Sequence, residues 1–420
     1  MRKKVAAAAV VATLALIATG CSGTAGQAES DGPAQISFLT GSGPDQGSNY
    51  TMQKLVDDYG QGATLEMEQL DASMDQRIQL LASQDKLPTF FQVGTPSQIE
   101  DLYNNGYIAD LEPVLKELGV YDDLSPFSVS IIKGLYGGHL VGLPLEVAVE
   151  GFWYNKALFA EEGIEAPQTW DDLTAAAEKL NAAGVQPFAT AGAAGWPVTR
   201  LVAGYIERSV GPDALSAVAD GSAKFTDPAY VKGADVISQW ASKGYFGEAP
   251  GALDIQTAED LFLQGKAGIY YQGSWATSSF DDAEKNKIGA DNIGWFPIPA
   301  VSGGKGDVGQ TPANVGLPMA VNAKTLTPQV KDFLKYLVEN YGTVALKDKG
   351  IISGFATDAK ASSPLVAETA DRIAGLDQFI PWFEALQSPE GTSASQSGAT
   401  ALISGSLTPE AFMQQVQAAQ

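Results

Sequence analysis

The chain has 420 residues, of which 45% are apolar, so it is long enough for two domains of ordinary size with a sizeable core. Its formal net charge of -23 argues against a nucleic-acid partner, because such partners need basic surface that neutralises phosphates. A single cysteine leaves no disulfide framework.

The first residues have the pattern of a secretory signal. A basic segment at 2–4 precedes an apolar run at 5–18, which is too short to cross a bilayer comfortably. Small residues then lead to Cys21, the only cysteine. This order resembles a bacterial lipoprotein signal, in which a peptidase cuts before a cysteine that carries lipid, although Ala18 stands where leucine is more usual.

The resemblance implies a signal peptide at 1–20, followed at 21–34 by a lipidated cysteine and a flexible tether of small and polar residues. The mature protein is then expected to be exported and anchored to the outer face of the cell membrane through Cys21, its only contact with the membrane. The alternative is an ordinary secretory signal with an unrelated cysteine near the cleavage site.

Strand and helix patterns alternate in the first part of the body. We expect strands at 35–40, 63–70 and 87–94, each followed by a helix, at 51–60, 73–84 and 95–106. This order predicts an α/β fold with a mostly parallel sheet. In such sheets ligands collect at the carboxyl ends of the strands, so the loops at 41–47, 71–73 and 93–97 are expected to face a cleft.

A long apolar stretch joins the two halves of the chain. Residues 135–159 are interpreted as a hairpin, a proline at Pro144, an extended run and a helix. The extended run carries two acids, Glu146 and Glu150. Farther on, Trp196 and Trp275 stand at loop-to-helix junctions, where a side chain can project toward a ligand.

Four blocks of sequence now resemble a known family. They are "GLPLEVAVEGFWYNKALF", "LFLQGKAGIYYQGSW", "IGWFPIPA" and "TPEAFMQQVQ". In this order they resemble the extracellular sugar-binding proteins of bacterial ABC importers, of the maltodextrin-binding type. The match runs from about residue 35 to the C-terminus.

The resemblance implies a two-lobed periplasmic-binding-protein fold, in which each lobe is a mostly parallel sheet flanked by helices. The first lobe is expected at 35–145 plus 312–349 and the second at 146–311 plus 350–420, joined by hinge crossings. A carbohydrate, expected to be an oligosaccharide, binds in the cleft, the lobes close on it, and the closed form docks on the transmembrane subunits of an ABC permease. The resemblance implies a monomer without a cofactor or metal.

Sugars are held by polar side chains at the rim of the ring and by aromatic faces on its flat sides. The loops and the resemblance together predict eight ligand-binding residues: Asp45, Gln46, Asp71, Gln92, Glu146, Trp196, Trp275 and Asp377.

Several of these residues have a second interpretation. Asp71 is equally well placed to cap the helix that starts near 73, and Trp382 either reaches the cleft or packs against a helix. Glu150 is expected in a solvated or capping role. Arg200 pairs either with a ligand hydroxyl or with a surface acid. The tryptophans in regular elements, Trp153, Trp170 and Trp240, are expected in the core.

Two other functions compete with an importer subunit. A secreted glycoside hydrolase or lyase needs two carboxylates, which this acidic chain offers in many places. A Ser-His-Asp triad would have to use His139, the only histidine, and the chain has no G-x-S-x-G motif. We therefore expect no enzymatic activity. The second competitor is a binder of a solute other than a sugar.

Overall fold

The computed structural model describes residues 32–41, 47–69, 74–94, 96–361, 363–376 and 378–420, except for four side chains at 75, 96, 97 and 278. The described residues from Pro33 to Gln420 form one compact unit. The predicted signal peptide and Cys21 lie outside the described residues. Because the body is one compact unit, the lobe boundaries stay predictions.

The first sheet of the described structure contains four strands in the order β2–β1–β3–β9. Its strands are β1 (Gln35–Thr40), β2 (Thr64–Gln69), β3 (Phe90–Gln92) and β9 (Met319–Val321). Strand β1 is parallel to both of its neighbours, as predicted, while β9 returns from far along the chain and lies antiparallel to β3.

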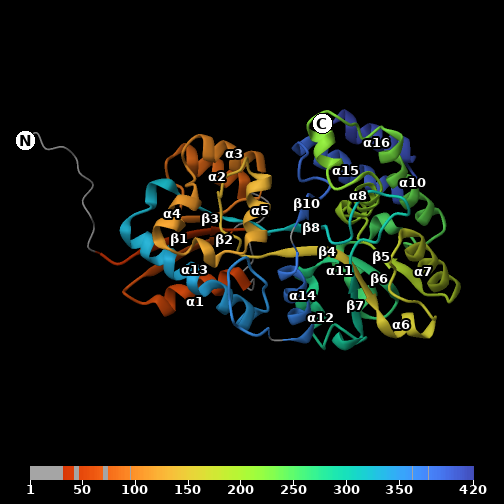
Figure 1. Cartoon of the computed structure of the whole chain (residues 1–420), viewed down its shortest axis with the longest axis horizontal. Coiled ribbons are helices and arrows are strands. Elements are labelled where there is room, and N and C mark those ends of the chain that lie inside the picture. Colours follow the sequence, from red (N-terminus) through yellow and green to blue (C-terminus); the bar gives the residue numbers. More distant parts are fainter. Residues whose placement is uncertain (1–31, 42–46, 70–73, 95, 362, 377) are drawn as a thin grey trace, which may run out of the picture. The chain divides into compact units, whose positions relative to one another are not determined.

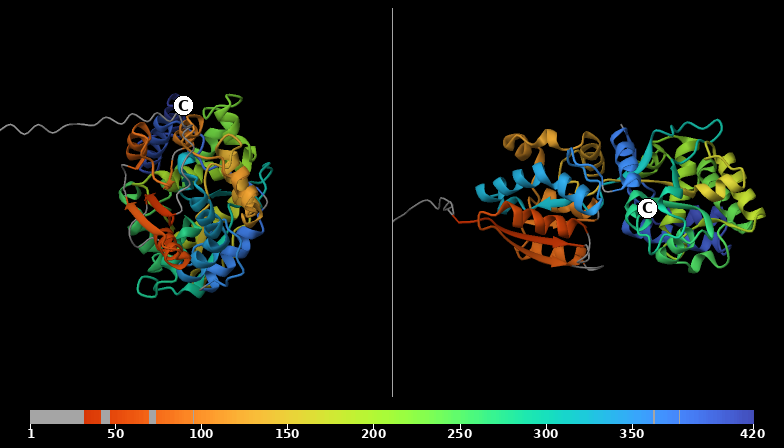
Figure 2. Two further views of the ribbon diagram at one scale, coloured as in Figure 1. Left: turned by 90° about the vertical axis from the view of Figure 1, so that its left-hand side faces the viewer. Right: turned by 90° about the horizontal axis from the view of Figure 1, so that it is seen from below.

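Helices cover this sheet, and the largest core cluster lies between them. The helices are α1 (Gly47–Tyr59), α2 (Met74–Ser83), α3 (Pro96–Asn104), α4 (Leu111–Leu118), α5 (Pro126–Leu135) and α13 (Pro328–Lys349), with short 3-10 turns at Tyr121–Asp123 and Ala323–Thr325. Helices α1 and α13 run side by side (Figures 1 and 2), and the Tyr59 and Phe333 rings meet between them with centroids 5.4 Å apart.

The second sheet has the order β10–β8–β4–β6–β5, and β7 also pairs with β4. Its strands are β4 (Ala148–Asn155), β5 (Gln186–Ala189), β6 (Ala267–Gly273), β7 (Ile293–Phe296), β8 (Thr311–Asn314) and β10 (Phe379–Ile380). This sheet is more mixed than the sequence predicts. Strand β4 runs antiparallel to β6, β7 and β8, and only the β5–β6 and β8–β10 pairs are parallel.

Helices also surround the second sheet. They are α6 (Lys156–Glu161), α7 (Trp170–Ala182), α8 (Trp196–Val210), α9 (Ala214–Ala219), α10 (Pro228–Ser242), α11 (Ile255–Leu263), α12 (Thr277–Phe280), α14 (Pro364–Ala374), α15 (Pro389–Ile403) and α16 (Pro409–Ala418), with 3-10 turns η2 (Pro250–Ala252), η3 (Ser274–Ala276) and η4 (Ala290–Asn292). Trp153, Trp170 and Trp240 are buried in the core, as predicted.

The predicted hairpin after residue 135 is wrong. Helix α5 ends at Leu135, and the next residues form a turn rather than a strand pair. Leu143 instead exchanges two backbone hydrogen bonds, of 2.9 and 3.0 Å, with Met319. A distant segment therefore satisfies the polar groups that a local hairpin would have paired. From this point β4 leads into the second sheet (Figure 1).

Gly195 precedes the first residue of α8 and lets α15 approach closely. Its φ of 72° lies in the left-handed region, and a β-carbon there would lie 2.2 Å from the carbonyl oxygen of Gln396. Both the backbone angle and the contact therefore require glycine. The position matters because Trp196 follows directly.

Replacement of Gly195 by alanine is predicted to destabilise the protein strongly. Gly163 is a matched control, because its φ of 58° is also left-handed but no atom lies within 4 Å of the site of a β-carbon. Gly163→Ala should lower the free energy of unfolding by about 1 kcal/mol, and Gly195→Ala by roughly 1–3 kcal/mol more. Urea unfolding measures both values. Equal losses would show that the contact with Gln396 is unimportant.

Candidate functional site

Two tryptophans project from the second sheet and its helices toward each other. Trp196 is the first residue of α8 and is half-buried, while Trp275 lies in η3 just after β6 and is 37% exposed. Their ring centroids lie 6.1 Å apart at 62°, an edge-to-face arrangement. Gly273 makes room for this, since a β-carbon there would lie 2.1 Å from the Trp275 ring.

A third tryptophan joins this group through an arginine. The guanidinium carbon of Arg200 lies 5.6 Å from the centroid of the Trp196 ring and 6.0 Å from that of the half-buried Trp382 ring. These distances are in the range of a cation–π contact. We call Trp196, Trp275 and Trp382 the tryptophan cluster.

Arg200 is buried and forms ion pairs with two acids. Its Nε donates to Glu150 Oε2 at 3.0 Å, and its Nη1 donates to Glu384. The hydroxyls of Tyr271 and Thr199 also donate, to Glu150 and Glu384 respectively. We call Glu150, Arg200 and Glu384 the buried charge network.

The charges in this network depend on one another. Burial raises the pKa of Glu150, against the opposing effect of Arg200 and the Tyr271 hydroxyl. Burial alone would lower the pKa of Arg200, but Glu384 and Glu150 raise it above its ordinary value. Arg200 therefore stays charged, and its charge is balanced inside the protein.

The predicted role of Glu150 is therefore wrong. The sequence predicts a solvated or capping position for this acid, but its side chain is 1% exposed and bound to Arg200. A buried carboxylate needs a partner. A single acid within an apolar strand is therefore the feature of the sequence that could have predicted a buried ion pair. Of the two interpretations of Arg200, pairing with a surface acid is also wrong, because both partners are buried.

Glu146 and Trp275, two of the predicted ligand residues, line the same small cavity of about 60 Å³. The end of α13 and the residues after it also line the cavity, with Lys349, Gly350, Ile351 and Ile352. The remaining lining residues are Val147, Ser274 and Thr277. Burial raises the pKa of Glu146.

Glu146 also lies near the carboxyl ends of β1 and β3. A β-carbon on Gly316 would lie 3.3 Å from Glu146 Oε2, and the next residue, Leu317, lies against Gly41 and Gly94. Gly41 follows β1 directly, and Gly94 lies two residues after the end of β3. Glu146 is thus linked through Gly316 and Leu317 to the edge of the first sheet where the sequence places the ligand.

Gln92 ends β3 and is 3% exposed. Its Oε1 accepts from the Thr40 hydroxyl at 2.7 Å and from the Gly41 amide at 3.0 Å, so it holds the end of β1. Contact of Gln92 with ligand stays a prediction. The other predicted ligand residues, Asp45, Gln46, Asp71 and Asp377, lie outside the described residues.

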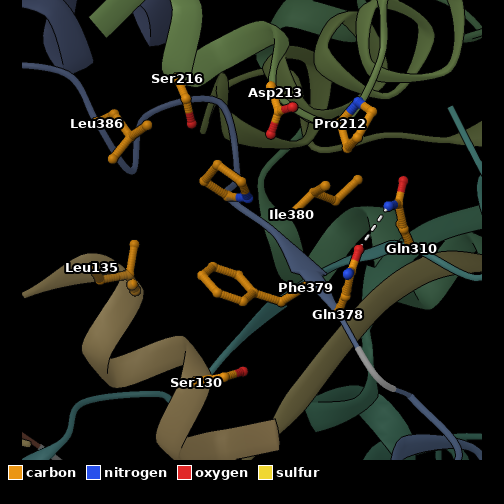
Figure 3. A pocket seen from close by; sticks show the side chains of 12 residues that line it. Ser130, Leu135, Pro212, Asp213, Ser216, Gln310, Gln378, Phe379, Ile380 and Leu386 are labelled. Atoms are coloured by element: carbon orange, nitrogen blue, oxygen red, sulfur yellow. Dashed lines mark hydrogen bonds between the residues drawn. The ribbon is translucent and has the colours of Figure 1, made fainter. Parts of the chain in front are cut away.

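A second hollow, of about 540 Å³, lies near the other end of α8. Its lining includes Leu135 of α5, Phe379 of β10 and Asp213 (Figure 3), and Gln310 Nε2 donates to Gln378 Oε1 at its edge at 2.9 Å. Figure 3 shows Phe379 pointing toward Leu135.

The tryptophan cluster is the better candidate for a sugar site. Helix α8 has 15 residues, about 22 Å, and separates Trp196 at its start from Pro212, which lines the second hollow just beyond its end. The lining of that hollow has one aromatic ring, that of Phe379. Sugar rings stack on flat aromatic faces, and the tryptophan cluster supplies three aromatic side chains.

Neither a metal site nor a membrane span is found in the part of the chain that the structure describes. There, no three His, Cys, Asp or Glu side chains are grouped to hold a metal ion. Nor does any helix there combine the length and apolar character that crossing a bilayer requires.

A further acid, Glu207, is buried two turns beyond Arg200 in α8. Both of its carboxylate oxygens are buried without a hydrogen-bond partner in the described structure. The neighbouring Arg208 donates instead to the carbonyl oxygens of Ile298 and Gln310, at 2.9 and 2.6 Å. Burial raises the pKa of Glu207 to about 8, although the Arg208 charge opposes this. Glu207 is therefore mostly neutral at pH 7.

Comparison with known proteins identifies one family. The sequence pattern of the family "Bacterial extracellular solute-binding protein" matches residues 43–342. The "Multiple sugar-binding protein" of Streptococcus mutans is 29% identical over 205 residues, which cover 46% of each chain. The chain spans about half or less of the length of the curated relatives that it matches first.

Solved structures of similar fold cover almost the whole body. A "Chitin oligosaccharide binding protein" is 25% identical with a TM-score of 0.77, over 92% of this chain and 98% of that one. The solute-binding protein RafE in complex with raffinose has the same fold, with a TM-score of 0.70 at 16% identity, over 92% and 98%. The predicted fold class is confirmed.

Replacement of Glu207 by glutamine is predicted to change how stability depends on pH. The native pKa of about 8 lies above the ordinary value of 4.5, so the native state holds a proton that the unfolded state loses in this range. Wild type should therefore lose stability relative to Glu207→Gln as pH rises from 4.5 to 8, by a few kcal/mol in order of magnitude. Urea unfolding at several pH values measures the difference. A constant difference between the two proteins would contradict the raised pKa.

Proposed function

Because the chain belongs to the bacterial extracellular solute-binding protein family, we propose that it captures a carbohydrate for an ABC importer and delivers it to the permease. The observation that carries the proposal is the tryptophan cluster, in which half-buried and exposed rings are held at fixed positions. Relatives named for binding chitin oligosaccharides or raffinose support an oligosaccharide as the ligand.

Capture requires contacts from both sides of a cleft. We propose that Trp196 and Trp275 stack on sugar rings and that Glu146 accepts a hydrogen bond from a sugar hydroxyl. The remaining predicted ligand residues, Asp45, Gln46, Asp71, Gln92 and Asp377, supply the polar rim. A sugar that touches both lobes favours the closed state, because only there are both sets of contacts made. The permease then recognises the closed form.

The protein is proposed to bind its ligand without chemical change. A glycoside hydrolase places two carboxyl groups on either side of the scissile bond. Here two acids that are linked to the tryptophan cluster through Arg200, Glu150 and Glu384, are 1% and 5% exposed. Both acids are thus buried and paired with Arg200. This arrangement favours a binding protein.

Thermal unfolding with a panel of ligands tests the proposed function. The panel contains galactose, raffinose, diacetylchitobiose, glycerol 3-phosphate and a tripeptide, and the sugar samples are checked for new reducing ends. At a sugar concentration 100 times Kd, a specific sugar should stabilise the protein by about 2.7 kcal/mol, without turnover. A shift with the phosphate or peptide alone, or new reducing ends, would overturn the proposal.

We further propose that the protein is exported and held at the outer face of the cell membrane by lipid on Cys21. The sequence supports this, because a short apolar run at 5–18 leads through Thr19 and Gly20 to the only cysteine, and a polar segment follows it. Several acyl chains anchor a protein stably, whereas one alone does so only marginally.

Replacement of Cys21 by serine should release the protein from the membrane. The wild-type protein, expressed in a bacterium that processes lipoproteins, is expected in the membrane fraction, and Cys21→Ser in the soluble fraction. Ser22→Ala is the control and should stay membrane-bound. Fractionation followed by immunoblotting measures the distribution. Equal distribution of wild type and Cys21→Ser would contradict lipidation.

A further inference from the structure

The segments that carry the three tryptophans meet at one residue of strand β4. Glu150 pairs in the sheet with Gly273, two residues before Trp275. Its backbone oxygen accepts from the hydroxyl of Thr311 at 2.9 Å, and Thr311 pairs with Phe379 of β10, three residues before Trp382. The side chain of Glu150 binds Arg200, which lies against the Trp196 ring.

Arg200 is poorly placed to touch a ligand itself. Its side chain is 10% exposed, and two of its nitrogens are bound to Glu150 and Glu384. Its guanidinium lies instead against the rings of Trp196 and Trp382. A planar guanidinium can bind two acids and contact rings at once, which a lysine ammonium cannot reproduce.

The two acids determine where Arg200 sits. Glu150 comes from a strand of the sheet, and Glu384 from the segment just after Trp382, so Arg200 joins elements that are distant in sequence. The interior excludes water from these contacts, so the ion pairs are not weakened by solvent competition. The guanidinium therefore has a single position and orientation, and the rings that pack on it are fixed in the same way.

From this geometry we propose that Arg200, held by Glu150 and Glu384 and packed between Trp196 and Trp382, is a positioning residue that fixes the Trp196 ring for stacking on sugar without touching the sugar. The inference rests on the proposed function, because it assumes that the tryptophan cluster binds sugar. According to this proposal, the buried charge network increases the affinity for sugar by holding the tryptophan rings in place.

The test compares sugar affinity in two backgrounds. Binding of galactose, raffinose and diacetylchitobiose is measured by calorimetry, and the sugar that wild type binds most tightly is the probe. Arg200→Lys should weaken binding roughly tenfold, about the contribution of one ring contact. In a Trp196→Ala/Trp382→Ala background the same change should alter affinity less than about twofold, because the rings through which it acts are gone.

Two further variants separate positioning from folding. Glu384→Gln keeps the shape of the side chain and leaves Arg200 paired with Glu150, so it should fold and still weaken binding severalfold. Arg372→Lys is the matched control, because Arg372 lies 3.9 Å from the Trp295 ring outside the tryptophan cluster. It should leave affinity unchanged. Tryptophan fluorescence without sugar should shift in Arg200→Lys, since the ring environments change.

Three outcomes would overturn the inference. Equal losses from Arg200→Lys in both backgrounds would show that Arg200 contacts the sugar directly. Wild-type affinity in both Arg200→Lys and Glu384→Gln would show that the network has no part in binding. If wild type binds none of the three sugars, the proposed function fails and this inference with it, an outcome distinct from the other two.

Discussion

The pairing of Arg200 with Glu150 and Glu384 is the interaction on which the geometry of the site depends. Moving charges out of water costs several kcal/mol for each ion, and this cost is offset only where partners and hydrogen bonds are well placed. The protein meets that condition with hydroxyls from Tyr271 and Thr199 on the two acids. Such a network tolerates few arrangements, which restricts how α8, β4 and the segment after β10 can pack.

This restriction has a consequence for ligand binding. Two rings of the tryptophan cluster, Trp196 and Trp382, lie against Arg200, whose charge is already balanced by the two acids. These rings offer flat apolar faces to a ligand. The positive charge of Arg200 beneath them is paired with acids and is not free to bind the ligand. That surface suits an uncharged ligand with C–H faces, which describes a neutral sugar. The adjacent cavity adds Glu146, whose carboxylate can accept from a hydroxyl.

Local patterns predicted the elements well, and distant contacts account for what they missed. Strands β1 and β3 follow from apolar runs and β2 from alternating apolar residues, and all three lie parallel as the local patterns indicate. The hairpin predicted after α5 does not form, because Leu143 pairs instead with Met319, in a strand far along the chain. The predicted role of Glu150 is wrong for the same reason, because its partner Arg200 is 50 residues away in the sequence. Arg200 is in turn 184 residues from its other partner, Glu384. Sequence spacing carries no information on such pairs.

A crystal structure of the protein with its tightest-binding sugar tests the central claim most directly. The account predicts a sugar ring within about 4 Å of the Trp196 or Trp275 ring. In the same structure Arg200 should still be bound to Glu150 and Glu384 and have no contact with the sugar. Sugar bound instead in the hollow beside Phe379, with the tryptophan cluster unoccupied, would contradict the account.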